Sequence, residues 1–172
     1  GRVFMIGSAV DNQGVITAPN GDIVLAAGKS VRVAETGTPQ LQVEITAPAD
    51  SPLNLSAAAY GSRGIYSGMV RNSGVITANS AVREANGSIT LKASGDAVLA
   101  AGSSTTANGA NGGTVSVIAG GTASVSGTVE AKGDAGIGGQ VTILGDLTGV
   151  FDGARVNASG TTGGGTILVG GD

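Results

Sequence analysis

Rows of alternating polar and apolar residues begin at regular intervals along this chain, and most of them begin with glycine. The rows start at Gly1, Gly21, Leu41, Gly61, Gly87, Gly113, Gly139 and Gly165, so the period is about 20 residues at first and about 26 residues later. A fixed period that increases once by six and then holds is typical of a solenoid in which later turns carry a longer loop. The spacing therefore predicts a stack of eight coils.

The second and fourth positions of each row indicate how the coils pack. They are apolar in fifteen of sixteen cases, with Arg63 as the exception: Val3, Met5, Ile23, Leu25, Val43, Ile45, Arg63, Ile65, Ile89, Leu91, Val115, Val117, Val141, Ile143, Ile167 and Val169. Side chains alternate across a strand, so these residues share one face and the mixed residues between them share the other. Stacked coils would align the apolar residues in aliphatic ladders. We predict an all-β parallel β-helix.

A second family of short strands is predicted about thirteen positions into each coil. Residues 14–18 and 74–78 are identical Gly-Val-Ile-Thr-Ala pentapeptides, and the distance between them corresponds to three of the shorter turns. Asn12 and Asn72 stand two residues before the glycines of these pentapeptides, and Asn-x-Gly between apolar runs predicts a corner. Further members of this family are expected at 30–33, 53–55, 97–99, 123–125 with 128–131, and 155–158.

The additional six residues of the later coils lie after Ala78. Longer loops rich in Gly, Asn, Ser and Thr are predicted to form a column on one edge, at residues 79–86, 103–112, 132–138 and 157–164. Residues 35–59 contain three prolines, are the least regular part and are the candidate for an excursion from the helix. We interpret residues 1–172 as a single β-helix segment of a longer solenoid, with short coils over 1–60 and long-loop coils over 61–172.

Composition excludes several classes of function. With 32 Gly, 2 Phe, 2 Tyr and no Trp, the chain cannot build a core on large aromatic residues. It has no Cys and no His, which removes disulfides, thiolate and imidazole metal ligands and His-dependent catalytic triads. A net charge of -3 argues against a nucleic-acid partner or an anionic membrane surface. No apolar run approaches the roughly 20 residues of a membrane span, so no membrane insertion is expected.

Candidate chemical motifs are incomplete. Lys29 lies in Ala-Ala-Gly-Lys-Ser, but a phosphate-binding loop needs a glycine where Ile23 stands. Asp146 and Asp172 coincide in adjacent rows, a weak candidate for a cation, and the calcium-binding nonapeptide rhythm is absent. Asn54, Asn86 and Asn157 begin glycosylation sequons. We therefore predict no catalytic, cofactor-binding or metal-binding residues and no cofactor.

Three segments of the sequence resemble a known protein family. Residues 14–28, residues 70–74 and the Gly-rich residues 163–172 resemble filamentous-haemagglutinin-type exoproteins, which bacteria export by two-partner secretion. The resemblance runs through essentially the whole chain, although the Asn-Pro-Asn-Gly-type motifs of the family's secretion domain are not evident. It implies a right-handed β-helix, passage through a dedicated outer-membrane transporter that recognises another part of the protein, and a location on the bacterial surface or outside the cell.

These observations leave three hypotheses for function. The first is a non-enzymatic structural and adhesive segment of a large surface exoprotein involved in virulence, either an adhesin or the stalk of a contact-dependent toxin. The second is a binding module whose long-loop face, or whose excursion over residues 35–59, contacts host-cell glycans or receptors. The third is a fragment of a β-helical polysaccharide-cleaving enzyme. Paired carboxylates in a substrate groove would be required for the third, and aromatic sugar platforms are nearly absent, with only Phe4, Tyr60, Tyr66 and Phe151.

Overall fold

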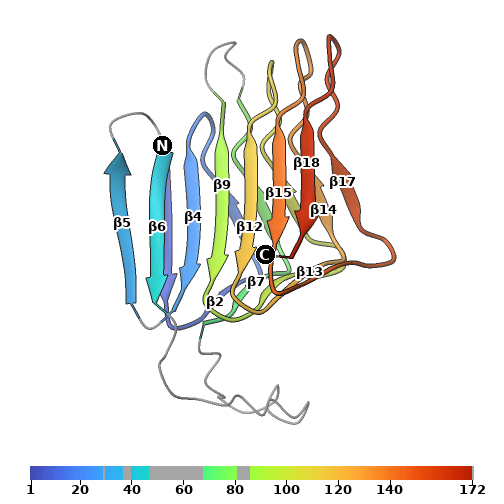
Figure 1. The fold of residues 1–172 in the computed structure, drawn as a ribbon. Coiled ribbons are helices and arrows are strands. Elements are labelled where there is room, and N and C mark those ends of the chain that lie inside the picture. Colours follow the sequence, from blue (N-terminus) through green and yellow to red (C-terminus); the bar gives the residue numbers. More distant parts are fainter. Residues whose placement is uncertain (29, 37–39, 47–67, 81–85, 172) are drawn as a thin grey trace.

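A computed structural model describes residues 1–28, 30–36, 40–46, 68–80 and 86–171, and within these residues it contains strands and turns but no helix. Three sheets are built entirely from parallel strands; each of five coils contributes one strand to each sheet, and the last row adds a sixth strand to the largest sheet alone. The chain is therefore a parallel β-helix, as the row pattern predicts. Figure 1 shows the strands of the largest sheet side by side.

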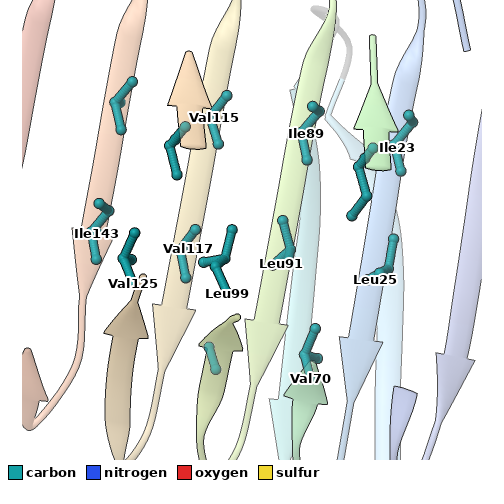
Figure 2. Close-up of a cluster of buried hydrophobic side chains, with 14 of the residues drawn as sticks. Ile23, Leu25, Val70, Ile89, Leu91, Leu99, Val115, Val117, Val125 and Ile143 are labelled. Carbon is teal, nitrogen blue, oxygen red and sulfur yellow. The ribbon is translucent and has the colours of Figure 1, made fainter. Parts of the chain in front are cut away.

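The largest sheet, here called sheet A, contains the predicted rows. Its strands are β1 (Arg2–Gly7), β4 (Asp22–Ala27), β9 (Ser88–Ala93), β12 (Thr114–Ala119), β15 (Gln140–Leu144) and β18 (Thr166–Gly170). The register places inward residues directly above one another, for example Val115 on Ile89 and Val141 on Val115. In the four inner strands the predicted inward residues are fully buried: Ile23, Leu25, Ile89, Leu91, Val115, Val117, Val141 and Ile143. Figure 2 shows these aliphatic ladders facing the residues of the opposite wall.

The remaining strands form two sheets rather than one family. Sheet B consists of β2 (Val10–Asn12), β7 (Val70–Asn72), β10 (Ala97–Leu99), β13 (Thr122–Val125) and β16 (Leu147–Val150). Sheet C consists of β3 (Val15–Thr17), β8 (Val75–Thr77), β11 (Ser104–Thr106), β14 (Thr128–Glu130) and β17 (Arg155–Asn157). The sequence pattern missed β2, β7, β11 and β16. Residues 104–106 are all hydroxylic and fall in a predicted loop, yet Thr105 is fully buried.

The corner between sheets B and C uses the predicted Asn-x-Gly motif. The Gly14 amide donates to the Asn12 side-chain oxygen at 3.3 Å, and the Gly74 amide donates to that of Asn72 at 3.1 Å. Neither asparagine has a positive φ, so the corner depends on a side-chain hydrogen bond rather than on a left-handed backbone. Asn12 donates to Asn72 at 2.9 Å, and Asn72 donates to the hydroxyl of Thr105 at 3.1 Å. This ladder satisfies polar side chains inside an otherwise apolar core.

The structure corrects the number of coils in the first half of the chain. Strand β4 pairs directly with β9, with Asp22 opposite Ser88, so sheet A has no strand between them. The row predicted from Leu41 is wrong as a coil, because its residues form β6 in a separate hairpin. The row predicted from Gly61 lies outside the described residues. The two identical pentapeptides are direct neighbours, with Val15 opposite Val75, and are not three turns apart.

An excursion leaves the helix after β4. Strands β5 (Ser30–Thr36) and β6 (Gln40–Thr46) pair antiparallel, with Val33 opposite Val43. The excursion expected within 35–59 thus begins earlier, at residue 30. Strand β6 contacts β4 and β9. By alternation, Val24 and Ala26 of β4 point away from the helix interior, yet they are only 2% and 0% exposed. We therefore infer that the excursion covers the outer face of sheet A at this end.

The glycines at the row starts allow the coils to approach each other closely. A Cβ atom at Gly113 would collide with the carbonyl oxygen of Gly87, and one at Gly139 would collide with that of Gly113. The same holds at Gly165 against Gly139. The amide of the residue after each glycine donates to the glycine carbonyl of the preceding coil, as Thr114 does to Gly87 at 3.0 Å. Backbone contact at this corner explains why the row starts are glycine.

Candidate functional surface

The longer loops form the predicted column along one edge of the helix. Parallel bridges join residues of successive loops, from Ser80 to Gly109, from Gly109 to Gly133 and from Gly133 to Gly160. Backbone hydrogen bonds accompany them, including Gly109 N to Lys132 O at 3.0 Å. The loops are thus held to one another as the strands are. Figure 1 shows them together above the strands of sheet A.

Asparagine side chains connect these loops from coil to coil. The Asn79 side-chain oxygen accepts a hydrogen bond from the Asn108 amide at 2.8 Å. The Asn108 side-chain oxygen in turn accepts one from the Lys132 amide at 2.7 Å, and its nitrogen donates to Glu130 at 3.0 Å. Each asparagine supplies an acceptor where a turning backbone would otherwise leave a donor unpaired. The result is an ordered platform rather than a set of independent loops.

The exposed chemistry of this loop column is polar and small. Its outermost residues in the last two loops include Asp134, Ala135, Ile137, Ser159, Thr161 and Thr162, all exposed. The side chain of Ile137 is 57% exposed and is the one large apolar group among them. Such a surface offers hydroxyl, carbonyl and carboxylate groups to a polar ligand, and it has no deep apolar pocket wall.

The outer face of sheet A is a second regular surface. On β9, β12 and β15 the first two outward positions carry uncharged polar side chains, namely Ser88, Thr90, Thr114, Ser116, Gln140 and Thr142, and the third carries Lys92, Ile118 or Leu144. They are half-buried except for Gln140, which is exposed. The sequence pattern predicted that these positions face outward, and the structure confirms it. Their regular spacing follows from the parallel register and does not by itself define a binding site.

Of the candidate chemical residues, Asp146, Asn86 and Asn157 lie within the described residues. Asp146 is exposed at the turn between β15 and β16. Its proposed partner Asp172, the phosphate-loop candidate Lys29 and the sequon residue Asn54 lie outside the described residues. Asn86 is exposed, whereas the side-chain oxygen of Asn157 accepts a hydrogen bond from the Ser159 amide at 2.9 Å.

The described aromatic side chains stand at opposite ends of the stack. Phe4 lies in β1 at one end, and Phe151 follows β16 at the other. Tyr60 and Tyr66 lie outside the described residues. Two phenylalanine rings separated by the length of the helix cannot form one stacking platform for a sugar chain.

The ionisable side chains of the described residues are mostly paired on the surface or scattered. Arg2 lies 3.3 Å from Asp22, Arg71 lies 3.9 Å from Asp11, and Arg155 lies 4.0 Å from Glu130. Within the described ranges, no group of three or more His, Cys, Asp or Glu side chains is placed to hold a metal ion. The same residues include no helix that is long and apolar enough to cross a membrane.

Two buried hydroxyl groups have no hydrogen-bond partner among the described atoms, those of Ser94 and Ser103. Each is packed against a glycine of a neighbouring coil, since a Cβ atom at Gly68 would meet the Ser94 hydroxyl and one at Gly127 would meet that of Ser103. These hydroxyls therefore lie in close packing between coils and do not point into a binding cavity.

Comparisons of the chain with protein-family models, with curated proteins and with solved structures found no match.

Proposed function

We propose that this β-helix is a non-enzymatic structural and adhesive segment of a large secreted bacterial surface protein of the filamentous-haemagglutinin type. The observation that carries the proposal is the unbroken stacking of coils from β9 to β18, with all three sheets continued in register. Each coil contacts mainly its neighbours, so the fold grows in one dimension and supplies length. The resemblance of residues 14–28, 70–74 and 163–172 to the exoprotein family supplies the cellular context.

The arrangement of polar groups supports a structural role better than a catalytic one. The interior of the stack is filled by aliphatic side chains such as Leu91, Val117 and Ile143. A glycosidase mechanism would need two carboxyl groups facing each other across a sugar-binding groove. The acidic side chains with nearby cations, Asp11, Asp22 and Glu130, come from three different sheets.

Lengthening the chain by whole coils tests the structural role. A variant with residues 113–138 duplicated should remain folded, because Val115 and Val117 of the added coil would stack on the same ladder. Small-angle scattering should show the long dimension growing by about 4.8 Å for each added coil, with an unchanged cross-section. Duplication of residues 113–125 alone is the matched control and should break the register. Growth of the cross-section in the whole-coil variant would contradict the proposal.

A binding role for the loop column is the second candidate function, and its coil-to-coil bridges favour it. A platform that is ordered before binding loses less conformational entropy when it meets a ligand. A glycan array probed with the purified chain should then give saturable binding that Thr161→Lys with Asp134→Lys abolishes. Thr90→Lys with Ser116→Lys, on the outer face of sheet A, is the control. Absence of binding, or equal loss in both double variants, would leave the structural role alone.

The proposed export by a dedicated outer-membrane transporter can be tested separately. In the exoprotein family a dedicated outer-membrane transporter is the export partner, and it recognises a part of the protein other than these residues. Sequencing the DNA that flanks the coding region should reveal a transporter gene of that class beside it. Expression of the complete gene with and without that neighbour, followed by surface protease digestion, would show whether the product reaches the cell exterior. Retention inside the cell with both genes present would count against the proposed location.

A further inference from the structure

Asparagine-glycine dipeptides gather at one edge of the helix. The chain contains four of them, which begin at Asn20, Asn86, Asn108 and Asn111. All four lie in connections that lead from sheet C to sheet A, at the edge that carries the loop column. Asparagine is a thermolabile residue. A glycine after it leaves the next amide nitrogen unobstructed, because glycine has no Cβ atom. This edge therefore has the sequence pattern for a reaction between an asparagine side chain and the backbone that follows it.

The dipeptide at Asn108 is held by hydrogen bonds on all sides. The Asn108 side-chain oxygen accepts from the Lys132 amide at 2.7 Å, and its nitrogen donates to Glu130 at 3.0 Å. The amide of the following residue, Gly109, donates to the Lys132 carbonyl at 3.0 Å. The side chain and the next nitrogen can therefore meet only after these bonds break.

Two further dipeptides are held in other ways. The Asn111 side-chain oxygen accepts from the Ile137 amide at 3.3 Å, and the Gly112 amide donates to the Ile137 carbonyl at 2.9 Å. Asn20 has a left-handed backbone with a φ of 53°, and its amide donates to the Asn79 carbonyl at 3.1 Å. Both asparagines are thus bonded to a neighbouring loop of the column.

The dipeptide Asn86-Gly87 lacks these restraints. Asn86 is exposed, and its side chain has no hydrogen-bond partner among the residues that the structure describes. The Gly87 amide also has no partner among them, whereas the equivalent amide of Gly113 donates to the Ala107 carbonyl at 2.8 Å. The two groups that would react can therefore meet at Asn86 without the loss of a hydrogen bond.

We propose that Asn86 is a self-modification site, at which the chain converts asparagine to isoaspartate and aspartate with water as the co-reactant. The Gly87 nitrogen bonds to Cγ of Asn86 while its proton passes through water to Nδ2, which leaves as ammonia. Water then opens the resulting cyclic imide. Opening at Cγ gives aspartate, and opening at the main-chain carbonyl gives isoaspartate. The net change is asparagine and water to an acidic residue and ammonia, without oxidation or reduction.

The reaction changes the junction between the loop column and β9. Isoaspartate routes the main chain through the former side chain and so adds a methylene group before Gly87. Gly87 is closely packed, since a Cβ atom there would collide with the Ala78 carbonyl oxygen. Its own carbonyl accepts from the Thr114 amide of the next coil at 3.0 Å. The product therefore carries additional backbone length and a negative charge beside a tight contact between coils.

Mass spectrometry of the chain after incubation in ¹⁸O-labelled water, below its unfolding temperature, tests the site. Cleavage after Arg and Lys places Asn86 in residues 84–92 and both Asn108 and Asn111 in residues 93–132. Asn86 should exchange its amide nitrogen for an oxygen from the labelled water and give both isoaspartate and aspartate. The variant Asn86→Gln should lose the signal from residues 84–92, because the longer side chain does not close the same ring.

The unfolded chain is the matched control, because alanine precedes and glycine follows Asn86, Asn108 and Asn111 alike. In guanidinium chloride the three should react at similar rates. In the folded chain Asn86 should react at least about tenfold faster than Asn108, since the reaction at Asn108 must first break its hydrogen bonds. An equal or lower rate at Asn86 in the folded chain would overturn the proposal. So would aspartate without isoaspartate, or a tenfold lead that persists in the unfolded chain.

Discussion

The outer face of sheet A differs between its two halves. At β4 the outward residues Val24 and Ala26 are buried, whereas at β12 the aligned residues Ser116 and Ile118 are half-buried. The strands have the same inward ladders and the same parallel register, so the helix itself does not account for the difference. Strand β6 makes its main contacts with sheet A at β4 and β9.

This comparison shows that outward positions report what covers a sheet. Alternation alone predicts which side chains point outward, and it does not predict whether water lies beyond them. A fully buried apolar outward residue such as Val24 indicates a cover, since burial of a valine side chain stabilises a fold by about 1.5–3 kcal/mol. Half-buried outward residues such as Ser116 and Ile118 indicate an uncovered face. The excursion therefore adds a second layer over one part of sheet A.

The largest expected loss of stability is for a substitution in the interior of the helix. It is the reference for the smaller effects expected on the outer face. Val117→Asp should lower the free energy of unfolding by about 4 kcal/mol or more, because an unpaired carboxylate would enter a dry aliphatic ladder. Ser116→Asp, on the next residue, should change it by no more than about 0.5 kcal/mol. Urea denaturation of the two variants measures both values. Similar losses would mean that the register of β12 is wrong.

A smaller but clear effect is expected where the outer face is covered. Val24 and Thr90 are opposite one another in β4 and β9 and both point outward. Val24→Asp should cost about 2–4 kcal/mol, since the new carboxylate would lie at a position that is only 2% exposed. Thr90→Asp should cost less than half of this, because Thr90 is partly accessible to water. Thermal melts of both variants suffice, and equal costs would contradict the difference in burial between Val24 and Thr90.

The sequence predicted the parallel β-helix, the ladders and the loop column because each depends on period-two alternation and on a constant coil length. It did not predict that Leu41 leaves the stack, because any strand alternates, and Val43 with Ile45 satisfies the inward pattern in a hairpin as well as in a coil. Val10 and Val70 pair in adjacent coils although the sequence separates them by about three short coils instead of one. The inserted segment thus has the length of two short coils. The later rows therefore still start at positions that fit an uninterrupted repeat.

Two local signals of the excursion were present in the sequence. Arg63 breaks the inward pattern, and the prolines cluster within 35–59. The split into sheets B and C was harder to predict, because strands of three residues provide little alternation to detect. Strand β11 could not be predicted from the sequence. Its buried Thr105 is distinguished from a loop threonine only by the hydrogen bond that it accepts from Asn72 in the folded chain.

Removing the excursion tests the cover directly. Deletion of residues 28–67 joins Ala27 to Gly68 and makes the spacing from β2 to β7 equal to that from β1 to β4. The variant should fold as a β-helix but lose about 1–3 kcal/mol, because Val24 and Ala26 become exposed. Val24→Thr should then be nearly neutral in the deletion variant, although it costs about 1–2 kcal/mol in the full chain. Additive effects in this double-mutant cycle would show that the excursion does not cover Val24.

The smallest effect is expected on the uncovered half of the same face. Thr142→Val keeps a β-branched side chain of similar shape on β15, and it removes one weak hydrogen bond, from Gln140 at 3.4 Å. The free energy of unfolding should change by no more than about 0.5 kcal/mol, since surface substitutions of this kind rarely exceed that value. Val141→Thr, one residue earlier and fully buried, should cost about 1–3 kcal/mol because its hydroxyl would lack a partner. Urea denaturation compares the pair, and stabilisation by Thr142→Val of more than about 1 kcal/mol would indicate that this half of the face is covered as well.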